Sequence, residues 1–156
     1  MNRILISLVL TGVLGLYCGI ANAGNFVVGT GTRAGTVMGL MWQQCSDGLS
    51  GAGCVTGAAV AVTWDNAIAY CEGLSLGGFT DWRLPNIEEL KSIVDVTTYN
   101  PAINTAYFPT TVSAGYWSSA SCAPGTPSYA WFVDFSYGRM GSSNKTSTHY
   151  VRCVRG

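Results

Sequence analysis

The sequence is poor in the residues that most catalytic sites need. It has one histidine, His149, among 156 residues, and only 10% of its residues are charged. No Cys-x-x-Cys or His-x-x-x-His spacing occurs, so a zinc site is not expected. An enzyme needs a nucleophile, base or metal held in mutual reach. We therefore expect a protein that is not an enzyme, with no catalytic residues, no metal site and no cofactor.

The chain also lacks an excess of charge of either sign, since Lys and Arg total 8 and Asp and Glu total 8. Generic nucleic-acid binding needs surplus cations to neutralise phosphates, so nucleic acid is not an expected partner. The charges are nevertheless unevenly placed, because no acid follows Asp134. Four cations do follow it: Arg139, Lys145, Arg152 and Arg155. This tail either presents a basic face, or Arg152 and Arg155 pair with carboxylates elsewhere.

Only one long hydrophobic run occurs, at the amino terminus. Residues 4–20 are almost wholly apolar and are followed by a small-x-small cleavage site. We predict a signal peptide over residues 1–23 and a single exported domain over 24–156, which is secreted, periplasmic or at the cell surface and has no membrane span. A lipid anchor on Cys18 is the weaker alternative, because bulky Tyr17 stands where a small residue is wanted.

Five cysteines remain after the signal peptide, and in an exported domain they are expected to form disulfides. Cys45 and Cys54 bracket a loop rich in Gly and Ser whose flexibility lets its ends meet, so we pair them. Cys71 lies on a predicted helix and Cys153 on a predicted last strand, and we pair these as well. Cys122 is left over, either as a free thiol or as an intermolecular link.

Two short helices are predicted to precede a run of strands. The first begins after Thr63, a plausible N-cap, and stops at Gly73. The second begins with a capping box between Asn86 and Glu89. Strands are predicted over residues 36–42, 115–119, 129–135 and 150–154, with loops centred on 124–127 and 138–147. Helices followed by strands indicate an α+β domain with an antiparallel sheet.

The last forty or so residues mix strand-forming aromatics with many small hydroxyl side chains. This combination supplies stiff amphipathic contact area and adaptable hydrogen bonding, as recognition loops do; the alternative is an ordinary Ser-rich sheet edge. Trp117 and Trp131 are candidates for stacking on a sugar ring, although aromatics on strands are more often core. We interpret His149 as a surface residue and expect Asp134 to pair with Lys145.

Six short strings follow one another along nearly the whole chain after the signal peptide. They are Leu40-Met-Trp-Gln43, Asp81-Trp-Arg-Leu-Pro-Asn86 with Glu89-Leu90, Asn100-Pro-Ala-Ile103, Tyr116-Trp-Ser-Ser119, Ala130-Trp-Phe-Val-Asp-Phe135 and Val151-Arg-Cys-Val-Arg155. Together they resemble the Lcl carboxy-terminal domain family, named for a bacterial collagen-like adhesin. The resemblance implies a C-type-lectin-like fold in exported bacterial proteins, in which a first-helix cysteine is usually joined to the last strand. The named adhesin binds sulfated glycosaminoglycans, but this chain has no Gly-x-y collagen repeat.

We therefore expect a disulfide-stapled, C-type-lectin-like α+β domain, with two short helices packed on antiparallel sheets, that acts as a ligand-binding or adhesion module. Its contact surface is expected to be a loop over residues 136–149 with the neighbouring strands, and its partner an anionic polysaccharide or a cell-surface protein. The candidate ligand-binding residues are Tyr137, Arg139, Ser142, Ser143, Asn144, Lys145, Ser147 and His149.

A second interpretation follows from the same fold, which is also that of the hypervariable receptors made by bacterial diversity-generating retroelements. The candidate residues other than Lys145 would then be the diversified surface of a protein-binding receptor. An enzyme of unknown type is the third alternative. The sequence does not indicate an oligomeric state.

Overall fold

The computed structural model describes residues 26–28, 40–122 and 127–156. The signal peptide predicted over 1–23, with the alternative lipid site at Cys18, lies outside the described residues. Residues 36–39 of the first predicted strand and most of the loop predicted at 124–127 also lie outside them. Among the described residues, no helix is long and apolar enough to cross a membrane.

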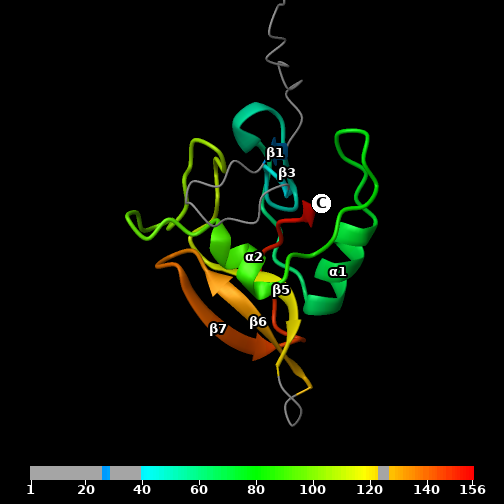
Figure 1. Ribbon diagram of the computed structural model, residues 1–156, viewed down its shortest axis with the longest axis vertical. Coiled ribbons are helices and arrows are strands. Elements are labelled where there is room, and N and C mark those ends of the chain that lie inside the picture. The colour runs from blue at the N-terminus through cyan, green and yellow to red at the C-terminus, as the bar shows by residue number, and fades with distance from the viewer. Residues whose placement is uncertain (1–25, 29–39, 123–126) are drawn as a thin grey trace, which may run out of the picture.

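A three-stranded antiparallel sheet positions the candidate residues (Figure 1). Its strands, in spatial order, are β5 (Gly115–Ser121), β6 (Tyr129–Asp134) and β7 (Arg139–Asn144). The prediction of a loop over residues 138–147 is wrong, because most of this segment is strand β7, which pairs with β6 along its whole length. Gly138 permits this tight hairpin, since its φ of 69° lies in the left-handed region that favours glycine.

The two helices lie on opposite faces of this sheet. They are α1 (Trp64–Glu72) and α2 (Ile87–Ser92), and both contact β5. Successive side chains on a strand point to opposite faces, so Tyr116 belongs to the core beside α2 and Trp117 to the core beside α1. The predicted α+β class with antiparallel sheets and two short helices is confirmed.

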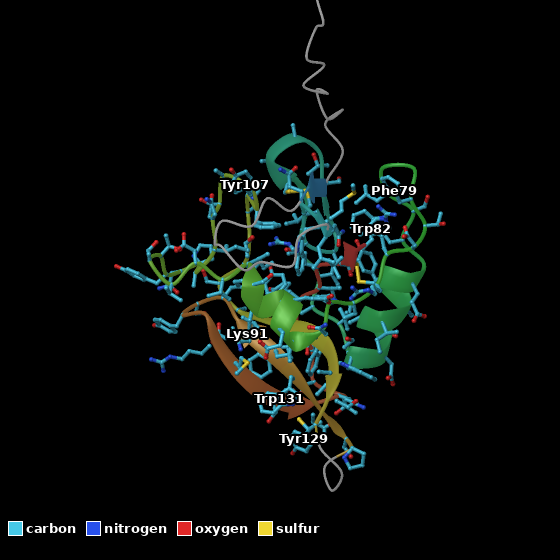
Figure 2. All side chains as sticks on the ribbon, viewed as in Figure 1. Phe79, Trp82, Lys91, Tyr107, Tyr129 and Trp131 are labelled. Carbon is cyan, nitrogen blue, oxygen red and sulfur yellow. A yellow bond between two sulfur atoms is a disulfide. The ribbon has the colours of Figure 1, made fainter. Side chains whose placement is uncertain are left out.

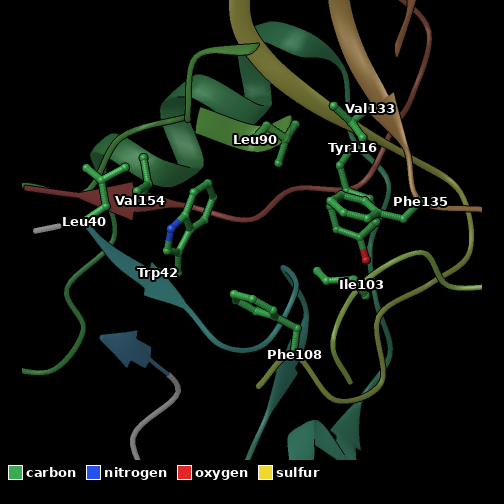
Figure 3. Close-up of a cluster of buried hydrophobic side chains, with 9 residues drawn as sticks. All are labelled: Leu40, Trp42, Leu90, Ile103, Phe108, Tyr116, Val133, Phe135 and Val154. Atoms are coloured by element: carbon green, nitrogen blue, oxygen red, sulfur yellow. The ribbon is translucent and has the colours of Figure 1, made fainter. Parts of the chain in front are cut away.

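The core beside α2 is mainly aromatic and aliphatic (Figure 3). Its buried members are Leu40, Trp42, Leu90, Ile103, Phe108, Tyr116, Val133, Phe135 and Val154. Tyr116 packs edge-on against Phe135, with ring centroids 5.1 Å apart, and its hydroxyl lies 2.8 Å from the Ser46 hydroxyl. The ring is therefore buried while its polar atom remains hydrogen-bonded.

The core beside α1 contains one of the two disulfides. Cys71 on α1 is bonded to Cys153, and both are fully buried beside Trp82 and Trp117. The second disulfide joins Cys45 and Cys54. Both predicted pairings are confirmed. The remaining cysteine within the described ranges, Cys122, forms no disulfide with the other described cysteines.

The other strands are short. A second antiparallel sheet has the order β1 (Phe26–Val28), β2 (Met41–Gln43) and β8 (Val154–Arg155), and a two-stranded ladder joins β3 (Leu49–Ser50) to β4 (Thr56–Gly57) around the 3-10 turn η1 (Ala52–Cys54). The last strand predicted over 150–154 is thus mostly irregular, although Tyr150 makes an isolated parallel bridge to Tyr116.

The second helix has the predicted capping box. The Asn86 side chain accepts a 2.8 Å hydrogen bond from the Glu89 N–H, and the Glu89 carboxylate accepts one of 2.8 Å from the Asn86 N–H. The same carboxylate accepts two 2.7 Å bonds from Arg83, which the sequence did not reveal. The hydrogen bonds and charge of Arg83 hold the pKa of Glu89 below its usual value. Thr63 precedes α1 as expected, but its side chain makes no cap hydrogen bond.

Candidate ligand-binding site

The predicted ligand-binding residues lie along β7 and at both of its ends. Tyr137 and Arg139 lie at the turn that joins β6 to β7, and Lys145 follows the other end of β7. Six residue steps of extended chain separate Arg139 from Lys145, a distance of about 20 Å at roughly 3.3 Å per residue. The predicted set is therefore not one compact cluster but two groups at opposite ends of β7.

At the turn end, Arg139 is an exposed cation. Its guanidinium carbon lies 5.8 Å from the centroid of the Tyr137 ring. Asp134 lies directly across the hairpin, but its carboxylate accepts a 2.8 Å hydrogen bond from the Ser136 N–H. The ion pairs among the described residues are Arg83–Glu89, Lys91–Glu88 and Arg155–Asp81. Within that part of the chain, Arg139 makes no ion pair.

At the other end, Lys145 does not pair with Asp134, so that prediction is wrong. Its ammonium lies 4.0 Å from the centroid of the Trp64 ring, at the start of α1. The Trp64 N–H donates a 3.0 Å hydrogen bond to the Lys145 carbonyl, which fixes the two residues together. Lys145 is half-buried and serves as a cation–π contact between α1 and the end of the hairpin.

The polar residues between these ends differ in their freedom to bind. Ser142 is exposed and Ser143 is half-buried. The Asn144 side chain accepts hydrogen bonds from the N–H and hydroxyl of Thr146, at 3.0 and 2.9 Å, and so stabilises the turn after β7. Ser147 is exposed in that turn and donates its N–H to the Asn144 carbonyl. Ser142 and Ser147 are available to a ligand, whereas the Asn144 oxygen is occupied.

His149 is not the surface residue that the sequence indicated. Its ring stacks on Phe132 at 4.4 Å and meets Trp117 edge-on, also at 4.4 Å. Its Nε2 atom is buried and makes no hydrogen bond to the described residues. Burial lowers the pKa of His149, while the charge of Asp134 acts in the opposite direction. His149 thus packs the carboxy-terminal segment against Trp117 of β5 and Phe132 of β6.

A residue that the sequence did not single out lies beside the turn end. Tyr99 belongs to the segment that follows α2, and its neighbour Asn100 donates an N–H to the Ser136 carbonyl at 3.0 Å. The side chain of Tyr99 is 73% exposed, and that of Tyr137 is 62% exposed. This juxtaposition depends on contacts between residues some 36 positions apart, so the local sequence pattern held no signal for it.

A family model, the Lcl C-terminal domain, matches residues 31–155 of the chain. The chain belongs to the Lcl C-terminal domain family. A search among curated proteins found no match. The family match includes the β5–β6–β7 sheet, both disulfides and the segment around Tyr99. The turn-end residues are therefore part of the Lcl C-terminal domain itself.

In this Lcl C-terminal domain, α2 covers only part of one face of the β5–β6–β7 sheet. A separate apolar strip lies on the same face. Tyr129, Trp131 and Met140 share that face and are between 37% and 48% exposed. Figure 2 shows Trp131 and Tyr129 beyond Lys91 of α2, toward the far end of the hairpin. Trp117 is buried as expected for a strand aromatic, whereas Trp131 remains accessible to a partner.

The last two arginines of the Lcl C-terminal domain are already engaged. The Arg155 side chain donates hydrogen bonds of 2.6 and 2.9 Å to Asp81 and lies 3.8 Å above the Phe79 ring. Of the two alternatives for this tail, pairing with a carboxylate holds for Arg155. It does not hold for Arg152, because its guanidinium is buried beside Phe108 and donates to the Ser46 and Thr111 hydroxyls instead. Neither arginine contributes to an open basic face.

Proposed function

We propose that this chain is an exported, non-enzymatic binding domain that contacts an anionic polysaccharide through the turn end of the β6–β7 hairpin. One observation carries the proposal: Arg139 is exposed, makes no ion pair among the described residues and lies beside the exposed ring of Tyr137. A guanidinium binds carboxylate or sulfate through two parallel hydrogen bonds, and an aromatic ring offers a flat face to a sugar.

The distribution of the other cations supports this location. Of the four cations after Asp134, Arg152 is buried, Arg155 pairs with Asp81 and Lys145 lies on Trp64. Arg139 is thus the member of the acid-free tail with an exposed guanidinium available for an ionic ligand. The contact surface is accordingly smaller than the 136–149 segment expected from the sequence.

Export and the finer fold belong to the same proposal. Two disulfides support maturation in an oxidising compartment, which agrees with the signal peptide inferred over 1–23. We also infer a C-type-lectin-like fold, supported by the family membership and by the disulfide from the first helix to the carboxy-terminal strand region. The adhesin role follows the family resemblance and is tested with the ligand.

Chromatography on immobilised heparin tests the proposal. Wild-type protein is expected to be retained at low salt and to elute as salt shortens the Debye length, from about 10 Å at 0.1 M to about 3 Å at 1 M. Arg139→Ala is expected to elute earlier, with an unchanged melting temperature. Lys91→Ala is the matched control, because it removes the same charge from an exposed pair with Glu88. Wild-type protein that flows through at low salt would contradict the proposal.

A protein partner is the second candidate function, favoured by the apolar strip. Tyr129, Trp131 and Met140 expose two aromatic rings and a thioether on one face. Such residues are typical of the central contacts in protein interfaces. If heparin does not bind, Trp131→Ala in a screen against cell-surface proteins becomes the informative variant.

A further inference from the structure

Two segments far apart in the sequence meet at the turn end of the hairpin. Figure 1 shows the segment between α2 and β5 beside the turn that joins β6 to β7. Two backbone hydrogen bonds join them, from the Asn100 N–H to Ser136 at 3.0 Å and from the Ala102 N–H to Phe135 at 2.6 Å. Gly138 allows a close approach as well, because a side chain there would collide with Val94. The two segments therefore form one surface.

Each segment presents a tyrosine on this shared surface. Tyr99 precedes Asn100 and Tyr137 follows Ser136, so the Asn100–Ser136 hydrogen bond brings the backbones of the two tyrosines close together. They are the two most exposed tyrosines among the described residues. Most of each tyrosine side chain is therefore open to a ligand, and the Arg139 guanidinium lies 5.8 Å from the centroid of the Tyr137 ring.

The backbone that bears Tyr99 is held by local hydrogen bonds. The Asp95 carboxylate accepts from the N–H and the hydroxyl of Thr97, at 2.9 and 2.6 Å. The backbone at Tyr99 thus lies between this turn and the Asn100–Ser136 contact. A backbone held in place before binding loses less conformational freedom when a ligand arrives, which favours affinity.

The geometry points to a subsite for one anionic sugar residue, formed by Tyr99, Tyr137 and Arg139. The inference rests on the proposed function and names the ligand class at that site: a uronate or a sulfated sugar in a polysaccharide. Arg139 binds the acidic group, and the two tyrosines contact the sugar ring and its hydroxyls. Tyr99, from outside the hairpin, is the residue that makes the subsite different from a single surface arginine.

One nearby charge opposes the ligand. Asp134 faces Arg139 across the hairpin, and its carboxylate is turned toward the Ser136 N–H. It reduces the positive field at the subsite without occupying the guanidinium. We therefore expect affinity to depend on the tyrosines as well as on charge, and a purely ionic ligand without a ring to bind less well.

The test compares variants of the mature protein for binding to dextran sulfate and to unsulfated dextran. The variants are Tyr99→Ala, Tyr137→Ala, Arg139→Ala and, as the matched control, Tyr129→Ala. Tyr129 is also an exposed tyrosine, but it lies at the opposite end of β6. Each of the three substitutions at the subsite is expected to weaken dextran sulfate binding roughly fivefold, the effect of losing one aromatic or cation–π contact. Tyr129→Ala is expected to bind like the wild type.

The outcomes separate the inference from the proposed function. If the wild type binds neither dextran sulfate nor heparin, the proposed function itself fails. If the wild type binds and Arg139→Ala weakens binding while Tyr99→Ala matches Tyr129→Ala, the proposed function stands and the shared subsite is overturned. If Tyr99→Ala and Arg139→Ala weaken binding equally, and the double variant loses less binding free energy than the two single variants added together, the result supports a single subsite. Melting temperatures of all variants exclude unfolding as the cause.

Discussion

Arg139 and Lys145 stand at opposite ends of strand β7, and each lies beside an aromatic ring. Arg139 lies beside Tyr137 on the exposed turn, whereas Lys145 lies on the half-buried ring of Trp64. The same type of contact therefore has two different consequences. The first leaves a cation open to solvent, and the second ties a helix to the sheet.

Loss of the Lys145 charge should reduce stability more than binding. Lys145→Met keeps much of the side-chain volume but removes the cation–π contact with Trp64. We expect the free energy of unfolding to fall by about 0.5–1 kcal/mol, while retention on heparin stays close to that of the wild type. Denaturant titration measures the first quantity. A large loss of heparin retention with unchanged stability would assign Lys145 to the ligand site.

The long disulfide should contribute more stability than the short one. Cys71 and Cys153 are separated by 82 positions, and Cys45 and Cys54 by 9. In the chain-entropy model these closures contribute about 4.5 and about 2.7 kcal/mol. Paired Cys→Ala variants, compared by thermal unfolding, should show the larger drop for Cys71 and Cys153. A larger drop for the short loop would mean that strain or packing outweighs loop entropy.

The buried arginine should be replaceable by an apolar side chain of similar length. Arg152 is 1% exposed, and its Nε and Nη1 atoms make no hydrogen bond to the described residues. Burial lowers its pKa to about 10, so it remains charged at neutral pH. We expect Arg152→Ala to cost at least about 3 kcal/mol through lost packing, and Arg152→Met to cost less than about 1.5 kcal/mol. Equal losses would show that the charge itself holds the Ser46 and Thr111 hydroxyls in place.

Stability should decrease as the pH falls below about 6.5, the usual pKa of an unfolded histidine. Burial lowers the pKa of His149 in the folded protein, so the unfolded chain binds the proton more readily between the two values. The folded state is therefore favoured above about 6.5 and loses this contribution as the pH drops toward the lower, folded pKa. The contribution of His149 is measured by comparing the melting temperatures of the wild type and His149→Gln between pH 8 and pH 5.

The pH slope of the variant is the informative quantity in that experiment. His149→Gln removes the titrating group, so its melting temperature should vary less over the same range. The Glu89 carboxylate, whose pKa is lowered by Arg83, contributes only at more acidic pH. Parallel slopes for the two proteins would contradict a depressed histidine pKa.

Features set by short-range patterns were predictable from the sequence. The Asn86–Glu89 capping box and the helix ending before Gly73 depend on residues within a few positions of each other. The Cys45–Cys54 pairing follows likewise from a flexible loop between its ends. These features depend only on residues that are near each other in the chain, so a local sequence pattern is enough to predict them.

Features that depend on distant partners were not predictable in the same way. Strand β7 is rich in Gly, Ser and Asn, which disfavour strands in isolation, and it forms because β6 supplies a full ladder of hydrogen bonds. The sequence suggests Lys145 as a partner for Asp134, but the fold places the Lys145 ammonium on the Trp64 ring instead. Tyr99 reaches the hairpin only through tertiary contacts, so the sequence left it out of the site.

The most direct test of polysaccharide binding at the turn end is an NMR titration of ¹⁵N-labelled protein, residues 24–156, with a heparin oligosaccharide. We expect the largest amide shift changes at Tyr99, Tyr137 and Arg139, and little change at Lys145. Changes centred on Tyr129 and Trp131, or spread evenly over the surface, would contradict this expectation.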